Sequence, residues 1–452
     1  MANSSASLSA TESSWLYRPV FPESWDRCVL YSLAAWINGM AFKNINFSPT
    51  GRPVIKIAEI KNGITEQTQF TDSEYDQRYF VTRGDMLFSW SGQPETSIDA
   101  FYWDGPDGWL NQHVFKVLPN GEACSPEFFY YILKYVKPNF IGIARNKQTT
   151  GLGHVTKADL EAIHVATPGR PIQDRIAHVL GKLDSRIAVN RRMIRTLEKM
   201  AAAIYKSWFI DFDPVHAKAE GRDTNLPAEI ANLFPDSFED SDLGPIPKGW
   251  KAKPLPEAID INPKRTLAKG TLAPFLEMSN MPTRGPSPDA WRLREMGSGM
   301  KFVNGDTLVA RITPCLENGK TAFVDFLADG EVGWGSTEYI VLRPLGDIPP
   351  VFAYLLARTG DFRNFAIQQM TGSSGRQRVP ADSLTKYSIV GPEIHSPIFR
   401  AFGQFVSPSF RRISAAMRQS RNLARMRDTL LPKLLSGEIE LPDAVENLGG
   451  RV

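Results

Sequence analysis

Two glycine-punctuated stretches hold the side chains of this sequence best suited to bind another molecule. Residues 148–155 are QTTGLGHV, and residues 369–379 are QMTGSSGRQRV. Each stretch combines glycines with side chains that donate and accept hydrogen bonds, and such polar loops are where a scaffold usually places its binding groups. The second stretch starts 369 − 148 = 221 residues after the first. The sequence therefore predicts a binding function that occurs twice in one chain.

The motifs of the common enzymes are missing from the sequence. It contains no G-x-S-x-G elbow, no H-E-x-x-H, no G-x-x-x-x-G-K-[ST] phosphate loop and no G-x-G-x-x-G after a strand. DIPPV at 347–351 resembles the D/N-P-P-aromatic signature of amino-group DNA methyltransferases only superficially. Glu59 and Lys61 form a bare E-x-K, half of a common nuclease signature, but no suitably spaced acidic partner stands out. A chain that carries out no catalysis of its own is therefore predicted.

Cysteine and histidine usage predicts no metal site. Cys28, Cys124 and Cys315 have no C-x-x-C spacing and no nearby histidine, which favours a reduced, intracellular compartment. His154 and His164 fit ordinary polar positions better than metal ligands. No cofactor is expected in this chain.

Length and composition indicate two or three globular domains. The chain has 452 residues, 42% hydrophobic and 22% charged, and a net charge of +3, which by itself is too small to indicate a nucleic-acid partner. Residues 1–14 are polar and lack the basic and apolar regions of a signal peptide, so a disordered tail is predicted. No apolar run approaches the roughly 20 residues needed to span a bilayer, and no membrane partner is expected.

Segments of the first half recur in the same order in the second half. Trp25 of PESW and Trp250 of PKGW are 250 − 25 = 225 residues apart, and Val155 and Val379, which follow the two glycine-rich loops, are 379 − 155 = 224 apart. The glycine-aspartate pairs of TRGDMLFSWSG and VNGDTLVARIT are 305 − 84 = 221 apart. A tandem duplication is predicted, each copy being a mixed α/β unit of short strands followed by helix.

A long helix is predicted after each copy. Between 171 and about 210, an alternating three-then-four spacing typical of a coiled-coil seam joins Leu180, Leu183, Ile187, Asn190, Ile194, Leu197, Ala201, Ile204 and Trp208. Asn190 is the single polar member, and a lone Asn in such a seam fixes register at some cost in stability. We expect Ile187, Ile194, Leu197 and Ile204 to pack against the second helix. Ser407 and Pro408 predict that this C-terminal helix starts or kinks there.

Positive charge is concentrated on these helices. Residues 171–210 carry eight basic side chains against three acidic ones, and residues 395–436 carry eight against one. A solvated helix face explains any single side chain equally well, but the collective excess favours an anionic partner. Between the halves, the segment around 216–247 is acidic, rich in Pro and Asp and without periodicity, which predicts a loosely packed surface linker.

Several motifs resemble one protein family. KSWFIDFDPVHAKAEG at 206–221 and RDTLLPKLLSGEIELP at 427–442 resemble the ends of the two central helices in the specificity subunit of type I restriction-modification systems. PKGW at 247–250 is similar to the opening of that family's target recognition domain, and TTGLGHV and TGSSGRQRV are similar to its glycine-rich loop before the final strand. The resemblance covers the chain from about 15 to 440.

The resemblance implies a non-catalytic DNA-recognition subunit in the cytoplasm of a prokaryote. Two target recognition domains would each bind one half of a bipartite, asymmetric site in double-stranded DNA. Two long antiparallel coiled-coil helices would relate these domains by a pseudo-twofold axis, set the spacer and dock two methyltransferase subunits. Those partners would supply S-adenosylmethionine binding and adenine-N6 methylation, and motor-nuclease subunits would use ATP and Mg.

The implied division of the chain follows the repeat. It gives a tail at 1–14, recognition domains at 15–170 and 248–394, central helices at 171–212 and 395–436, a linker at 213–247 and a second tail at 437–452. Tyr205, Trp208 and Phe209 are candidates for methyltransferase docking, with core packing the favoured alternative for Trp208.

The glycine-rich loops are the predicted DNA contacts. Gln and Asn can bond adenine bidentately, Arg can bond guanine, and hydroxyls or backbone N–H groups can hold phosphates. The candidates are Arg145, Asn146, Lys147, Gln148, Thr149, Thr150 and His154 in the first copy, and Gln368, Gln369, Thr371, Ser373, Ser374, Arg376, Gln377 and Arg378 in the second. Trp90, Ser91, Gln93, Arg311 and Thr313 are secondary candidates.

Purely structural roles remain open for the same residues. The glycines could simply form tight turns, Trp90 could belong to the core, and Arg311 could form an internal ion pair. The alternative function is a protein-binding scaffold with duplicated recognition units, in which the basic helices are merely solvated.

Overall fold

The chain forms two compact mixed α/β units. The computed structural model describes residues 18–65, 67–148, 151–288, 290–373 and 375–441. Unit 1 contains the described residues up to Ser185 together with those from Leu423 onward, and unit 2 runs from Arg186 to Asn422. Unit 1 is therefore built from two stretches of chain that are far apart in the sequence.

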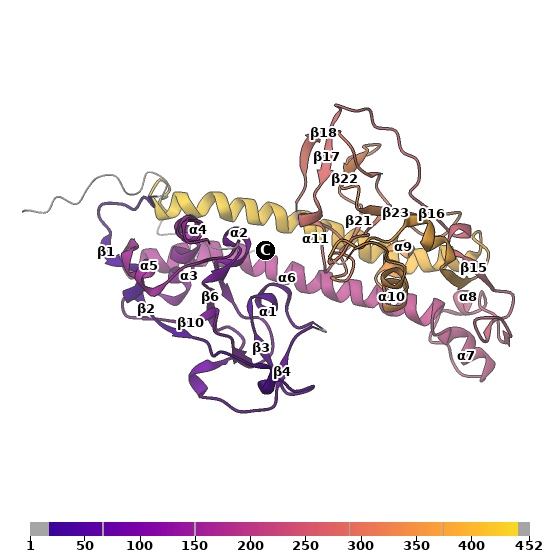
Figure 1. Ribbon diagram of the computed structural model, residues 1–452, viewed down its shortest axis with the longest axis horizontal. Coiled ribbons are helices and arrows are strands. Elements are labelled where there is room, and N and C mark those ends of the chain that lie inside the picture. Colours follow the sequence, from indigo (N-terminus) through magenta and orange to yellow (C-terminus); the bar gives the residue numbers. More distant parts are fainter. Residues whose placement is uncertain (1–17, 66, 149–150, 289, 374, 442–452) are drawn as a thin grey trace, which may run out of the picture. The chain divides into compact units, whose positions relative to one another are not determined.

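Two long helices, α6 (Arg170–Phe209) and α11 (Pro397–Leu435), contribute residues to both units (Figure 1). The sequence predicted both helices, and α6 begins and ends within a few residues of the expected limits. Of the two alternatives given for Ser407 and Pro408, a start of the helix is wrong, because α11 runs through both residues, and its observed bounds lie close to the 395–436 of the implied division. The helix begins at an earlier Ser-Pro pair, where the Ser396 hydroxyl accepts a hydrogen bond from the Ile398 amide at 3.2 Å.

In unit 2 the two helices pack along the predicted seam. Ile194 is buried with Ile413 and Ala416 of α11, and Leu197 and Met417 pack against this cluster. Asn190 side-chain Nδ2 donates to Gln419 Oε1 at 2.9 Å and to Ser420 Oγ at 3.2 Å. Since Asn190 contacts the later part of α11 and Ile194 the earlier part, the two segments run antiparallel.

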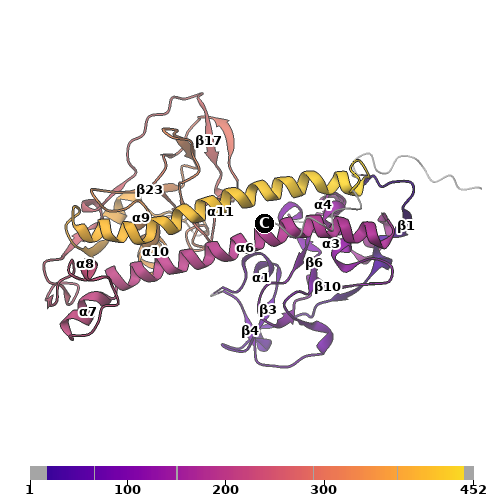
Figure 2. The ribbon, with the colours of Figure 1, turned by 180° about the vertical axis from the view of Figure 1, so that it is seen from behind.

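In unit 1 the first half of α6 lies against α3 (Pro126–Tyr135) and the end of α11 (Figure 2). The Asp184 carboxylate accepts a hydrogen bond from the Tyr131 hydroxyl at 2.8 Å and forms an ion pair with Arg427 at 2.6 Å. This ion pair raises the pKa of Arg427 although burial acts in the opposite direction. The polar contact therefore joins three helices at the edge of the unit 1 core.

The described residues of unit 1 form four sheets, one of which is the short pair of β7 (Ser91–Gly92) and β11 (Gly153–His154). Three others have counterparts in unit 2. The first is antiparallel in the order β2-β10-β6-β8, and the second has the order β4-β3-β9-β5, with β3 and β9 parallel. A separate pair joins β1 and β12. The strands are β1 (Asp26–Val29), β2 (Ala34–Asn38), β3 (Arg52–Ile55), β4 (Phe70–Thr71), β5 (Phe80–Val81), β6 (Met86–Ser89), β8 (Asp99–Tyr102), β9 (Gly108–Leu110), β10 (Val114–Pro119) and β12 (His164–Thr167).

Unit 2 has the same pattern of strand orders. Its sheets are β16-β23-β20-β21 and β18-β17-β22-β19, with β17 and β22 parallel, and its separate pair is β15-β24. The strands are β15 (Lys251–Pro254), β16 (Ile259–Ile261), β17 (Leu272–Leu276), β18 (Arg292–Glu295), β19 (Lys301–Phe302), β20 (Thr307–Ala310), β21 (Thr321–Phe323), β22 (Gly333–Gly335), β23 (Tyr339–Pro344) and β24 (Ser388–Gly391).

Helices cover these sheets and carry the loops. Unit 1 also contains α1 (Ile57–Asn62), α2 (Pro94–Ser97), α4 (Lys137–Asn146) and α5 (Lys157–Ala162). Unit 2 contains α9 (Val351–Ala357), every residue of which is buried, and α10 (Gly360–Gln368). In each unit two helices follow one another along the chain, α3 and α4 in unit 1 and α9 and α10 in unit 2. The glycine-rich loop follows the second helix in both units.

The segment between the halves is more tightly packed than the sequence predicted. It forms α7 (Asp213–Ala219), α8 (Ala228–Ala231) and the pair β13 (Phe238–Glu239) and β14 (Ile246–Pro247). Val215 and Phe234 are buried in the core of unit 2. The two apolar residues are spaced irregularly, so no periodic signal marked them. Among the described residues, no helix has both the length and the apolar character needed to cross a membrane.

The helix seam of unit 2 can be tested by truncating one of its side chains. Ile194→Ala removes a buried side chain packed between two helices and is expected to destabilise the protein by about 2–4 kcal/mol. Val189→Ala is the matched control, because Val189 lies on the same helix with 43% of its surface exposed. Thermal unfolding of both variants measures the effect, and equal losses of stability would contradict the seam.

Candidate functional site

The first glycine-rich loop joins α4 to the short strand β11 (Gly153–His154). β11 pairs with β7 (Ser91–Gly92), so that His154 lies opposite Ser91. The Val155 amide then donates to the Trp90 carbonyl at 2.8 Å. The structure thus brings the predicted loop and the secondary candidates Trp90 and Ser91 together. Gln93 follows directly and is exposed.

Gly153 lets this loop lie directly against α4. A Cβ atom at Gly153 would be 2.3 Å from the Ala144 carbonyl oxygen, a distance that no side chain could tolerate without a backbone shift. Gly151 has φ +87°, a left-handed conformation that favours glycine. The two glycines of the motif therefore have different roles, one for close approach and one for the turn.

Ion pairs hold the basic side chains that precede the first loop. Lys147 Nζ bonds both carboxylate oxygens of Asp159, at 2.7 and 2.6 Å, and Arg145 Nε bonds Glu95 Oε1 at 2.6 Å. Burial acts to raise the pKa of Asp159, but the hydrogen bonds from Lys147 and Thr156 outweigh it and lower that pKa. Lys147 is therefore fixed near the start of α5, whereas Arg145 and Gln148 are exposed.

Trp90 lies at the boundary between core and surface. It is half-buried, packs with Phe115 and donates from its indole Nε1 to Asn38 Oδ1 at 2.9 Å. His113 lies beside it, with ring centroids 5.6 Å apart. Asn38 and His113 were not among the sequence candidates, because only strand pairing brings them next to the loop.

The second glycine-rich loop is a closed turn. Thr371 and Arg378 exchange two backbone hydrogen bonds of 2.9 Å, and Gly372 and Gly375 within the turn have φ +118° and +80°. The Val379 amide donates to the Arg311 carbonyl at 2.8 Å, the same backbone bond that Val155 and Trp90 form in unit 1.

Backbone contacts also place two of the secondary candidates beside this loop. The Thr313 amide donates to the Gln377 carbonyl at 3.0 Å. The secondary candidates Arg311 and Thr313 are therefore adjacent to the second loop, as Trp90 and Ser91 are to the first.

A glutamate that the sequence analysis missed orders the arginines of the second loop. Glu338 forms an ion pair with Arg378 at 2.8 Å and lies 3.9 Å from Arg311 Nε. Arg311 therefore forms an internal ion pair, the structural alternative considered for it, and Arg378 forms one too. Arg376 is exposed and has no ion pair with any residue in the described part of the chain.

The remaining candidates of the second loop are accessible to different degrees. Gln368, Thr371 and Ser373 are exposed, and Gln369 and Gln377 are half-buried. Thr149, Thr150 and Ser374 lie outside the described residues.

The three aromatic docking candidates are buried. Tyr205, Trp208 and Phe209 belong to the core of unit 2, where Trp208 packs with Phe234 and Phe405. All three residues therefore pack in the core, which was the alternative favoured for Trp208. A partner would have to displace this packing to reach them.

The E-x-K residues have a structural role in unit 1. Glu59 is buried and accepts hydrogen bonds from the Lys56 amide at 3.1 Å and from the Thr68 hydroxyl at 3.1 Å, which fixes the start of α1. Within the described ranges there is no cluster of His, Cys, Asp and Glu that could hold a metal ion. The three cysteines are free thiols.

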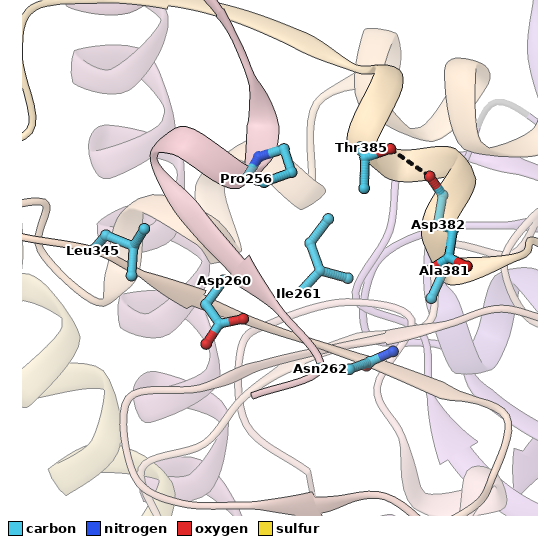
Figure 3. Close-up of a pocket in the computed structure, with 8 residues that line it drawn as sticks. All are labelled: Pro256, Asp260, Ile261, Asn262, Leu345, Ala381, Asp382 and Thr385. Carbon is cyan, nitrogen blue, oxygen red and sulfur yellow. Dashed lines mark hydrogen bonds between the residues drawn. The ribbon is translucent and has the colours of Figure 1, made fainter. Parts of the chain in front are cut away.

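An open pocket of about 500 Å³ in unit 2 has the wrong charge for DNA. Its lining includes the carboxylates of Asp260 and Asp382, drawn with their neighbours in Figure 3. Thr385 Oγ1 donates to the Asp382 carbonyl at 2.6 Å, so the backbone there is already satisfied. An acidic lining repels phosphate, which leaves the two loops as the candidate site.

Comparisons with known proteins find similarity to one family. Residues 22–199 match the model of the type I restriction modification DNA specificity domain. The type I restriction enzyme HindI specificity subunit of Haemophilus influenzae is 23% identical over 414 residues, which cover 79% of this chain and 87% of that protein. The EcoAI specificity subunit of Escherichia coli is 32% identical over 153 residues, which cover 32% of this chain and 26% of that protein.

Several solved structures align with most of the chain at low identity. The crystal structure of a type I restriction-modification system S subunit from M. genitalium aligns with a TM-score of 0.49 and 15% identity, over 92% of this chain and 97% of that one.

The contact between Gly153 and α4 gives a direct test of the loop geometry. Gly153→Ala should force β11 away from α4 and destabilise unit 1 by about 1–3 kcal/mol. Hydrogen exchange at the Val155 amide should become faster as its bond to Trp90 weakens. Gly121→Ala is the control, because a Cβ there meets no atom within 4 Å. Unchanged exchange in Gly153→Ala would show that the loop does not depend on this contact.

Proposed function

We propose that this chain is a specificity subunit of a type I restriction-modification system and that it recognises a bipartite DNA target, one half-site through each unit. It is a DNA-recognition subunit and not an enzyme, in agreement with the missing catalytic motifs. The observation that supports two half-sites is the repeated loop. The Val155–Trp90 bond of unit 1 has its counterpart in the Val379–Arg311 bond of unit 2, each 2.8 Å long.

A duplicated origin of the two units accounts for this repetition. The two four-stranded sheets of unit 1 correspond in strand order to those of unit 2, including the parallel pairs β3-β9 and β17-β22. The loops that these sheets hold differ in sequence, so the two half-sites should differ. The recognition domains then span about 15–170 and 248–394. The long helices supply much of the rest of each unit, and in unit 2 the segment 213–247 adds to it.

Some loop residues would contact bases, and others would bind phosphate or position the loop. Arg376 within the second loop and Gln368 just before it are exposed, and they would form hydrogen bonds to base edges. Arg378 is paired with Glu338, so it would act by orienting the turn and by attracting phosphate. In unit 1 the exposed side chains of Gln148 and Gln93 would contact bases, and Lys147 would position the loop through Asp159.

The long helices would set the spacer between the half-sites and dock the partners. In unit 2 their antiparallel seam, with Asn190 bonded to Gln419, fixes one register. Two methyltransferase subunits would bind these helices and supply S-adenosylmethionine and adenine-N6 methylation, and motor-nuclease subunits would supply ATP- and Mg-dependent restriction. Exposed basic residues such as Arg191 and Arg192 would face the DNA of the spacer.

Separate recognition of the half-sites can be tested at Arg376. Arg376→Ala should lower discrimination at one half-site by about 1–3 kcal/mol per base pair contacted, because alanine cannot form the bidentate bond to a base, and leave the other half-site unchanged. Arg222→Ala, an exposed arginine of unit 2 outside the loop, is the control. Binding of the assembled methyltransferase complex to duplexes altered in either half-site measures the effect. Equal weakening at both half-sites would refute separate recognition.

The spacer role predicts a change in target spacing. One heptad inserted into α6 after Arg192, with another inserted into α11 after Ala416, keeps the seam and lengthens the helices by about 10 Å, or about three base pairs. The methylated motif should then have a spacer longer by about three base pairs. A heptad inserted into the turn at Ser241–Gly244, outside the helices, should leave the spacer unchanged. An unchanged spacer in the helix variant would exclude this role.

A further inference from the structure

We infer that the hairpin of β17 and β18 in unit 2 is a second DNA contact, which binds phosphates of the duplex backbone without regard to sequence. This inference rests on the proposed function, since it assumes that unit 2 recognises DNA. It concerns residues outside the glycine-rich loop and its neighbours. No counterpart of comparable charge exists in unit 1.

The segment that contains the hairpin carries a marked surplus of positive charge. Residues 263–301 contain seven basic and three acidic side chains, a surplus of 7 − 3 = +4, whereas the whole chain has a net charge of +3. The corresponding residues of unit 1, 43–80, contain five of each sign, a balance of 5 − 5 = 0. The two copies thus differ in charge at this place, and the surplus belongs to unit 2.

Several of these cations have no acidic partner. Arg292 forms an ion pair with Glu277, and Arg265 forms one with the buried Asp306. Within the described part of the chain, Lys264, Lys269, Arg294 and Lys301 form no ion pair. Lys264, Lys269 and Arg294 are exposed. Mutual repulsion among unpaired cations favours the approach of a polyanion.

Aromatic rings hold the key arginine at the surface. Arg292 and Arg294 alternate along β18 and so project from the same face of the sheet. The Arg294 guanidinium lies 4.7 Å from the centre of the Phe275 ring and 5.6 Å from that of Trp334. Stacking fixes the guanidinium plane while its N–H groups remain available at the edge, which is the arrangement that suits a phosphate.

The position of the hairpin also fits a contact with DNA. β18 is the edge strand of its sheet, all four of its residues are exposed, and the hairpin stands apart from α9 and α10 in both views (Figures 1 and 2). The sheet is connected to the glycine-rich loop through β22. This strand ends at Gly335, and Glu338, 338 − 335 = 3 residues later, forms an ion pair with Arg378 of the loop. A duplex bound at the loop would therefore have this charged hairpin close to its backbone.

The corresponding sheet of unit 1 also has an arginine beside two aromatic rings, but this arginine has an acidic partner. Arg52 lies 5.0 Å from the Phe80 ring centre and 5.8 Å from that of Trp109, the residue at the position of Trp334. However, Arg52 is paired with Glu74, and acidic residues balance the charge around it. The backbone contact is accordingly assigned to unit 2 alone.

The salt dependence of binding tests this contact. The wild-type chain and the variant Lys269→Gln/Arg294→Gln are each assembled with the methyltransferase subunit and titrated with a duplex carrying the target, over a range of salt concentrations. The slope of log affinity against log salt falls by about 0.9 for each phosphate that is no longer neutralised, so the variant should have a slope smaller by about two. The recognised sequence should not change. The control Lys248→Gln/Lys251→Gln removes the same charge from exposed positions of unit 2 and should keep the wild-type slope.

A conservative variant separates charge from folding. Arg294→Lys keeps the cation and should retain the wild-type slope, whereas Arg294→Gln alone should reduce it by about one. A slope in the double variant equal to that of wild type would overturn the inference. A change confined to solubility would also overturn it, because that result is expected if the charges only protect the strand edge from aggregation. Dissociation of the methyltransferase subunit from the double variant, with no change in slope, would also overturn it. Failure of the proposed function is distinguishable, because the wild-type complex would then not prefer the target duplex over a scrambled one.

Discussion

Leu431, Leu434 and Leu435, near the end of α11, are buried in the same core as Phe128 and Leu180 of unit 1. They come from the last described part of the chain, whereas most of that core comes from the first part. Burial of apolar surface is worth about 25 cal/mol per Å², and unit 1 obtains a share of it only when the C-terminal helix returns to it. Asp184 and Arg427 add an ion pair at the same place. Unit 1 is therefore complete only when both ends of the chain are in place.

The long helices also supply part of the core beneath the second glycine-rich loop. In unit 2, α9 and α10 pack onto a core that includes Tyr205 and Phe402 from the two long helices. The loops then need only a few backbone bonds to be held, such as those from Val155 and Val379. Their side chains remain free to differ, which suits the proposed recognition of two different DNA sequences by domains of one architecture.

Local periodic patterns predicted much of this organisation. The heptad spacing gave the limits of α6 and the place of Asn190 in the seam, and the repeat placed Arg311 and Thr313 beside the second loop. Tertiary packing decided the rest. One Ser-Pro pair lies at the start of α11 and another inside it, and burial of Phe399 and Phe402 after the first pair outweighs the cost of Pro408 inside the helix. Asn38, His113 and Glu338 approach the loops through strand pairing across long separations, which no local pattern could reveal.

The central claim is that one chain specifies a split DNA target. Co-expression of the chain with its methyltransferase subunit, followed by genome-wide mapping of methylated adenine by single-molecule sequencing, tests this claim most directly. The account predicts one motif made of two different half-sites separated by a spacer of fixed length and arbitrary sequence. A single continuous motif, or an assembled complex that methylates without sequence preference, would contradict it.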